Sequence, residues 1–347
     1  MKLHANSVNW IKSYLTSRKQ KTTFKHVSSD ETTVTSGVPQ GSILGPVLFV
    51  CFTNDLTESF KEETVVSYAD DSQFIVTGKT LQEIKEKLES IIGRAEEWYK
   101  SNSLMSNPAK TEVIIFTPGR KQQKTPTITV YEEGKKIELQ SSKSLKVLGI
   151  HVDNKMNWDA QIHQLRSKTI GTVKHLHRVN KILPMKSKLQ LYDSLVASQL
   201  TYGDIIWSGC SETNKKKLQT VQNFALKSII GMRKHDSASE AHRILKYLDL
   251  EEKRKIHQAV FAHKALNGKT PVPITKEYSD LKSYEDHRSA MKGNLKIPAH
   301  KKSIYQRSVL YRTVKIWNST DPNIRKEETS RFKQELQRTM QKNKYAE

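Results

Sequence analysis

Two adjacent aspartates, Asp70 and Asp71, combine a residue type and a spacing that could do chemistry. They lie between two apolar runs in the stretch VVSYADDSQFIV, residues 65–76. β-Branched and aromatic residues on both sides of a short polar centre predict paired strands with a tight turn between them. Mg²⁺ is usually held by one or two carboxylates plus substrate phosphates, and two such ions can hold both oxygens of a phosphoryl transfer. Because Asp also suits turns for its own reasons, the pair alone leaves a metal site and an ordinary turn as alternatives.

The segment before this hairpin contains a loop rich in residues that permit sharp turns, SGVPQGS at residues 36–42. Ser42 suits the N-cap of a helix that runs through about Leu56, and Pro46 would be tolerated only in the first turn of that helix. Upstream of the loop, the pattern predicts an amphipathic helix at residues 7–17 and strands at residues 22–27 and 32–35. The loop therefore precedes the helix that leads into the hairpin.

The elements after the hairpin change in kind along the chain. Apolar residues at helical spacing predict a surface helix at residues 81–101. Short strands are predicted at residues 112–116, 127–131, 135–139 and 144–152. From Trp158 onward helical periodicity dominates, with predicted helices at residues 162–179, 189–206, 218–230, 251–266, 304–317 and 329–340. Gly231 is a plausible C′ residue for the third of these helices. The fold class predicted is α+β, with an all-helical second part.

The net charge of the 347-residue chain is +22, from 58 Lys and Arg against 36 Asp and Glu. Residues 1–150 carry 20 basic and 17 acidic residues, whereas residues 151–347 carry 38 and 19. This asymmetry indicates a polyanionic partner, most simply a nucleic acid, held mainly by the second half. The alternative is solubility, which a surface of mixed sign would provide equally well.

The number of cysteines and the lengths of the apolar runs indicate in which cellular compartment the protein lies. Only Cys51 and Cys210 are present, which excludes a disulfide framework and a cysteine zinc module. The N-terminus has no apolar signal region, and the run Val47–Phe52 is too short to span a bilayer. An intracellular protein of the nucleus or cytoplasm, neither secreted nor bound to a membrane, is expected.

The loop SGVPQGS followed by Tyr68-Ala69-Asp70-Asp71 resembles the palm of reverse transcriptases, and the non-LTR (LINE-type) retrotransposon enzymes in particular. Further segments are similar to later motifs of that family, at residues 107–116, 145–150, 202–207, 218–223 and 316–333. The resemblance implies an RNA-directed DNA polymerase that performs nucleotidyl transfer with two Mg²⁺ (or Mn²⁺) ions. It also implies an RNA template, a DNA primer or RNA–DNA hybrid, and deoxynucleoside triphosphates as partners; the oligomeric state stays open.

The resemblance also implies roles for particular residues. Asp70 and Asp71 would be carboxylate ligands of the metal ions, while Tyr68 and Ala69 would lie under the primer terminus. The loop that approaches template and incoming nucleotide would contribute Gly37, Pro39, Gln40 and Gly41. Lys110 would place a positive charge near the triphosphate, although a lone lysine before a strand is more often only solvated. Leu148 and Gly149 would form a primer-grip strand, with an ordinary buried strand and a glycine bulge as the alternative.

The family uses three catalytic aspartates, and the first lies on a strand upstream of the helix that opens this chain. Nothing in residues 1–36 fits that strand, since Asp30 is in a polar turn that favours a solvated residue. The expected organisation is an incomplete, N-terminally truncated palm at 1–157, a helical thumb at 158–232 and a basic helical C-terminal region at 233–347. Without the first catalytic aspartate and the fingers, the chain alone should be a very poor polymerase or none. The alternatives are a non-catalytic protein that binds RNA or RNA–DNA hybrid, and an unstable relic.

Overall fold

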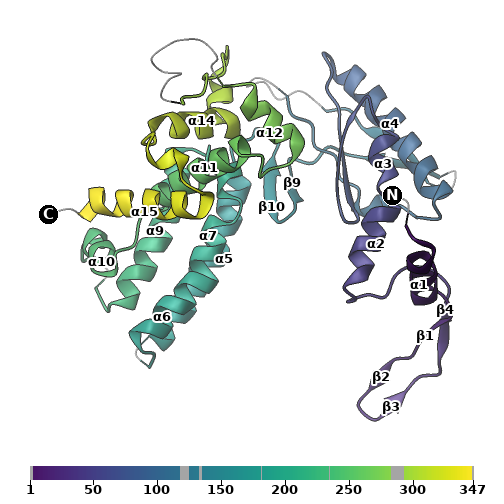
Figure 1. The fold of residues 1–347 in the computed structure, drawn as a ribbon, viewed down its shortest axis with the longest axis horizontal. Helices are drawn as coiled ribbons and strands as arrows, with labels where there is room; N and C mark the ends of the chain where they lie inside the picture. Colours follow the sequence, from purple (N-terminus) through teal and green to yellow (C-terminus); the bar gives the residue numbers. More distant parts are fainter. Residues whose placement is uncertain are drawn as a thin grey trace. The chain divides into compact units, whose positions relative to one another are not determined.

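The computed structural model describes residues 3–117, 125–132, 135–180, 182–233, 235–282 and 293–345. The chain divides into two compact units, Met1–Thr111 with Lys124–Ser141 and Glu112–Gln123 with Ser142–Glu347. Short hairpins and helices make up the first unit, and helices dominate the second (Figure 1), so the predicted α+β class is confirmed. Within the described ranges no helix is both long and apolar enough to cross a membrane.

The first unit consists of short antiparallel hairpins and four α-helices among its described residues. Its elements are α1 (Ala5–Leu15), β1 (Arg18–Gln20), β2 (Thr23–Phe24), β3 (Val27–Ser28), β4 (Thr32–Val34), α2 (Leu44–Phe52), α3 (Asp55–Glu58), β5 (Thr64–Tyr68), β6 (Asp71–Ile75), α4 (Leu81–Ser101), the 3₁₀ turn η1 (Pro108–Lys110), β7 (Ile128–Glu132) and β8 (Lys135–Leu139). The paired strands are β1 with β4, β2 with β3, β5 with β6 and β7 with β8.

Two sequence predictions for residues 42–116 were wrong. The helix expected from Ser42 to Leu56 is divided into α2 and α3, although Pro46 does lie in the first turn of α2. Of the strand expected at residues 112–116, only Val113 forms a β-bridge. The predicted bounds of α4 and β8 match the structure.

Helix α4 supplies the surface on which the β5–β6 hairpin packs. The buried residues of this small core are Leu56, Phe60, Ile91 and Ala95, with Val65 and Phe74 packed against them. The rings of Phe60 and Phe74 meet edge to face, with centroids 5.3 Å apart. Because these contacts involve the part of the hairpin far from its turn, the turn itself extends beyond the core.

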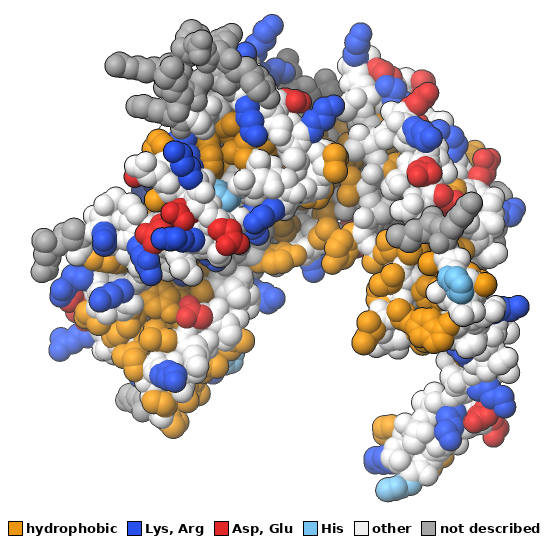
Figure 2. Space-filling model, viewed as in Figure 1, with side chains coloured by type: hydrophobic (Ala, Val, Ile, Leu, Met, Phe, Trp, Pro, Cys, Tyr) orange, Lys and Arg blue, Asp and Glu red, His pale blue; other side chains and the backbone are white. Residues whose placement is uncertain are grey.

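Helix α2 leaves most of its apolar side chains in contact with solvent. Val47, Val50 and Phe52 are each at least half exposed, and only Gly45 in this helix is buried. Figure 2 shows the resulting orange area over α2. The apolar sequence of this helix therefore does not predict that its side chains are buried.

The second unit is built from one hairpin and a series of packed helices. Its described elements are β9 (Ser144–Val147), β10 (Ile150–Asp153), α5 (Asp159–Val179), α6 (Met185–Tyr192), the π-helical turn η2 (Asp193–Ala197), α7 (Ser198–Thr201), α8 (Asp204–Trp207), α9 (Glu212–Ile229), α10 (Ala238–Leu245), α11 (Leu250–Leu266), α12 (Val272–Ser279), η3 (Ser303–Arg307), α14 (Val309–Ser319), η4 (Ile324–Lys326) and α15 (Thr329–Tyr345).

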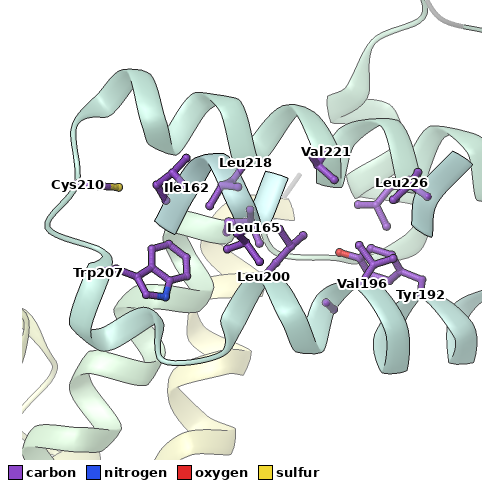
Figure 3. Close-up of a cluster of buried hydrophobic side chains, with 14 of the residues drawn as sticks. Ile162, Leu165, Tyr192, Val196, Leu200, Trp207, Cys210, Leu218, Val221 and Leu226 are labelled. Carbon is purple, nitrogen blue, oxygen red and sulfur yellow. The ribbon is translucent and has the colours of Figure 1, made fainter. Parts of the chain in front are cut away.

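The larger core of this unit lies between α5, the α6–α7 segment and α9 (Figure 3). Leu200, Trp207, Leu218 and Leu226 are fully buried there. A second core joins α11, α14 and α15 around residues such as Trp317. Ile150 of β10 belongs to the larger core, so this core also holds the β9–β10 hairpin.

Helix α9 ends as its sequence predicts. Gly231 has φ +76°, and its N–H donates to the carbonyl of Ser228 at 3.1 Å. The N–H of Met232 donates to the carbonyl of Lys227 at 2.9 Å, which completes the Schellman pattern. The prediction of Gly231 as the C′ residue is confirmed.

His263 on α11 provides a pH-dependent contribution to the stability of the second core. Its Nε2 lies 2.9 Å from the carbonyl oxygen of Glu327, its Nδ1 lies 3.2 Å from the amide nitrogen of Asn267, and its ring stacks on Phe332. The neutral ring satisfies both contacts, and burial lowers the pKa of His263 below 6.5. The unfolded chain therefore takes up the proton more readily, so stability is lost as the pH falls through about 6.5.

We expect urea unfolding to show a smaller free energy of unfolding at about pH 5.5 than at about pH 7.5. The decrease should be smaller in His263→Gln, which keeps a donor and an acceptor, than in the wild type. His175→Gln on the exposed face of α5 is the control. An unchanged pH dependence in His263→Gln would show that this ring does not carry the effect.

Candidate active site

The two aspartates lie at the tip of the β5–β6 hairpin, as the sequence predicts. Tyr68 pairs with Asp71, so Ala69 and Asp70 form the turn between the strands. Ala69 has φ +53°, a left-handed conformation that is uncommon for alanine. Asp70 and Asp71 are both exposed. Among the described residues no hydrogen bond or ion pair engages either carboxylate, so their oxygens are available to a hard cation.

The carboxylates are not part of a larger ligand cluster within the described residues. No group of three or more His, Cys, Asp or Glu side chains there is close enough to hold a metal ion. The donor set on the hairpin is therefore two aspartates, whose hard oxygens fit Mg²⁺ or Mn²⁺ together with further oxygens from a phosphate.

The Gly37–Gly41 loop is anchored from both sides. Gly37 and Gly41 have φ +74° and +79°, conformations that favour glycine. Arg18 donates from its guanidinium to the carbonyl oxygens of Ser36 at 3.0 Å and Gly37 at 2.6 Å. Within the described part of the chain, no hydrogen bond joins this loop to the carboxylates of the hairpin.

The C-terminal side of the loop is closed by a small hydrogen-bonded turn. The hydroxyl of Ser42 donates to the carbonyl of Pro39 at 2.6 Å and accepts from the N–H of Gly45 at 3.1 Å. A Cβ on Gly45 would lie 2.8 Å from the Ser42 hydroxyl, so glycine is needed there. The N-cap of α2 is Ile43, so the prediction of Ser42 as the N-cap was wrong by one residue, because the hydroxyl of Ser42 closes the turn before the helix. Pro39 is half-buried and Gln40 is exposed.

Lys110 ends the 3₁₀ turn η1, where the N–H of Lys110 donates to the carbonyl of Asn107 at 2.9 Å. The Lys110 side chain is exposed. In the described ranges it forms no ion pair with Asp70 or Asp71. Its role near a triphosphate stays a prediction.

Leu148 and Gly149 do not lie within a strand, and this part of the sequence prediction was wrong. They form a two-residue turn between β9 and β10, in which Val147 pairs with Ile150. Their φ angles are +46° and +87°, and positive values at both turn positions favour a tight hairpin. Both residues are exposed.

Sequence reasoning missed the residue that contacts this turn. The hydroxyl of Tyr202 donates to the carbonyl oxygen of Leu148 at 2.8 Å. A Cβ on Gly149 would lie 3.4 Å from the Tyr202 ring. Each segment carries a residue pair that ends in glycine, Leu148-Gly149 and Tyr202-Gly203, and these pairs drew attention to both segments. A local sequence pattern cannot show that two residues 54 positions apart are in contact.

Asp153 is a second residue that sequence reasoning missed. Its carboxylate accepts hydrogen bonds from the N–H groups of Lys155 and Asn157 at 3.1 Å each and from that of Trp158 at 2.6 Å. The turn between β10 and α5 is thereby organised by one buried carboxylate. Its role is to orient the start of α5.

Comparison with known proteins places the first part of the chain near one enzyme family. Residues 1–152 match the family "Reverse transcriptase (RNA-dependent DNA polymerase)". A probable RNA-directed DNA polymerase from transposon X-element of Drosophila melanogaster is 26% identical over 243 residues, which cover 68% of this chain and 26% of that protein. The corresponding protein from transposon BS of the same species is 25% identical over 262 residues, covering 73% of this chain and 28% of the relative.

A third relative is the RNA-directed DNA polymerase from mobile element jockey of Drosophila melanogaster, 23% identical over 253 residues. That match covers 70% of this chain and 27% of the relative. No solved structure matches significantly.

These matches identify the first part of the chain as a reverse transcriptase domain. The relatives to which the chain is similar are enzymes of LINE-type, non-LTR retrotransposons. It spans about a quarter of the length of these three curated relatives.

Proposed function

We propose that this chain is part of an RNA-directed DNA polymerase in which Asp70 and Asp71 bind divalent cations for nucleotidyl transfer. The observation that carries the proposal is the exposed carboxylate pair at a hairpin tip, with no protein partner among the described residues, inside the region that matches the reverse transcriptase family. When bound, two Mg²⁺ or Mn²⁺ ions would supply charge stabilisation for the attacking and leaving oxygens of the transfer.

The charge balance of the pair limits what this chain does alone. Two carboxylates neutralise half of the four positive charges that two divalent cations bring. Removing a charge-stabilising group from an active site typically costs several powers of ten in rate. We therefore expect primer extension by the isolated chain to be close to background unless a further oxygen donor is supplied.

The remaining residues of the site would position substrates. In this proposal Tyr68 and Ala69 support the primer terminus, and the exposed Lys110 lies near the triphosphate of the incoming deoxynucleotide. The anchored loop, with Gly37, Pro39, Gln40 and Gly41, approaches the template and the incoming nucleotide. Arg18 contributes by holding the backbone of that loop through two carbonyl oxygens.

The helical second unit would hold the RNA template and DNA primer, or their hybrid. Helix α5 carries one acidic residue, Asp159, at its first position. Its exposed face presents residues at helical spacing, His163, Ser167, Lys174 and Arg178, with the half-buried Gly171 between Ser167 and Lys174. Nothing lies within 4 Å of a Cβ placed on Gly171, so packing does not explain a glycine that costs the helix about 1 kcal/mol. A small residue one turn before Lys174 permits close approach of a phosphate backbone.

The division into a palm at 1–157, a thumb at 158–232 and a basic C-terminal region at 233–347 belongs to the same proposal. On that division α5 is the first helix of the thumb. Basic side chains on the described surface of the second unit are visible in Figure 2.

The second candidate function is binding of RNA or RNA–DNA hybrid without chemistry. It is favoured by the absence of a third acidic ligand near the hairpin among the described residues. Both functions require nucleic-acid binding by the basic second unit. They differ only in whether Asp70 and Asp71 bind divalent cations for nucleotidyl transfer.

Primer extension with Asp70→Ala distinguishes the two functions. We expect a low Mg²⁺-dependent incorporation of deoxynucleotides on an RNA template, which Asp70→Ala abolishes while binding of the primer–template is unchanged. Asp30→Ala removes another exposed aspartate from the same unit and serves as the control. Incorporation that survives Asp70→Ala would contradict the metal site, and tight binding without any incorporation would favour the second function.

A further inference from the structure

The turn between β9 and β10 adopts a conformation that its sequence does not favour. Leu148 has φ +46°, although leucine rarely occupies the left-handed region. The side chain is 42% exposed, so burial of the leucine does not offset the conformational cost. Strained non-glycine residues concentrate at functional positions, where surrounding contacts hold them in place.

The contact that holds Leu148 comes from Tyr202. Its hydroxyl donates to the Leu148 carbonyl oxygen at 2.8 Å, and its ring lies against Gly149. The tyrosine is itself 56% exposed, so it is held by other groups rather than by burial. The hydrogen bond thus joins two exposed positions on different segments of the second unit.

The groups that hold Tyr202 are rigid. The indole N–H of Trp207 donates to the Tyr202 carbonyl at 2.9 Å, and Trp207 is fully buried. Gly203 has φ +59°, and a Cβ there would lie 2.4 Å from Cδ1 of Ile150. The break between α7 and α8 is therefore fitted closely to the β9–β10 hairpin and directs Tyr202 toward the turn.

We propose that Tyr202 is the positioning residue that holds the Leu148–Gly149 turn in the conformation that contacts the end of the primer strand. The inference rests on the proposed function, because it takes the Leu148–Gly149 turn to be the primer-grip segment that the resemblance implies. Loss of the hydroxyl would leave the turn free to adopt conformations more favourable for leucine. The primer end would then be held less well, while contacts elsewhere along the nucleic acid would be retained.

Equilibrium binding of two RNA–DNA hybrids tests this inference. One hybrid has a recessed primer 3′ end, and the other has the same length with blunt ends. We expect the full 347-residue chain to bind the recessed hybrid more tightly. Tyr202→Phe keeps the ring and should weaken that binding about three- to tenfold, the effect of one hydrogen bond, with no change for the blunt hybrid. Tyr131→Phe removes a hydroxyl from a tyrosine that is 65% exposed on β7 and is the matched control.

Two further measurements separate positioning from a general structural effect. The midpoint of thermal unfolding should be nearly the same in Tyr202→Phe and the wild type, and hydrogen exchange should quicken only at residues 148–150. Equal loss of affinity for both hybrids, or an unchanged preference for the recessed end in Tyr202→Phe, would overturn the role of Tyr202 and leave the proposed function in place. A wild-type chain that binds neither hybrid would overturn the proposed function and this inference together.

Discussion

Raising the salt concentration from about 50 to about 200 mM should weaken binding of a primer–template hybrid by this chain about a thousandfold. The excess of 38 basic over 19 acidic residues in 151–347 provides the charge for such binding. If about six phosphates are contacted, the logarithm of the binding constant falls with a slope near −5 against the logarithm of the salt concentration. Fluorescence anisotropy of a labelled hybrid over a salt series measures that slope.

The face of α5 should account for part of this salt dependence. The double variant Lys174→Ala, Arg178→Ala removes two exposed cations and should make the slope shallower by about two. Lys61→Ala combined with Lys100→Ala removes two exposed lysines of the first unit and is the matched control. A flat salt response of the wild type would reject nucleic-acid binding in both of its proposed forms.

Trp207→Ala should destabilise the second unit severely, with a loss of about 4 kcal/mol in the free energy of unfolding. The ring is fully buried, and its removal would leave a cavity between α5, α7 and α9. The substitution would also remove the aromatic face that packs against the guanidinium of Arg254. Arg254 is 2% exposed, and its guanidinium lies 5.0 Å from the ring centroid of Trp207. The hydrogen bond from the indole to the Tyr202 carbonyl would be lost as well.

Urea unfolding measures this loss. Trp10→Ala on α1 is the control, because that ring is 58% exposed and its removal should cost no more than about 1 kcal/mol. Equal effects of the two substitutions would show that Trp207 does not organise the core. A large loss in Trp207→Ala should be accompanied by faster hydrogen exchange at the Leu148–Gly149 turn, since Trp207 holds Tyr202.

Elements with a strong local pattern could be predicted from the sequence. The β5–β6 hairpin, helix α4 and the Gly231 end of α9 each follow from alternation, helical spacing or a glycine after the last turn. The resemblance to reverse transcriptases is confirmed by the family match over residues 1–152. The tip of the hairpin was correctly predicted to carry Asp70 and Asp71.

Elements that depend on tertiary contacts could not be predicted. The stretch 144–152 reads as one strand because leucine at position 148 gives no turn signal, and its left-handed conformation is held by Tyr202 from a distant segment. The predicted helix 189–206 is interrupted because Gly203 must approach Ile150 closely. The exposure of α2 is likewise invisible in its sequence, which is apolar throughout.

The position of the bound metal tests the central proposal most directly. With Fe²⁺ in place of Mg²⁺, and with a reductant and peroxide, hydroxyl radicals cleave a polypeptide next to the metal. In the presence of a primer–template we expect cleavage concentrated at residues 68–71, lost in Asp70→Ala and in Asp71→Ala and retained in Asp30→Ala. Cleavage elsewhere, or cleavage at residues 68–71 that persists without both carboxylates, would contradict a metal site on the β5–β6 hairpin.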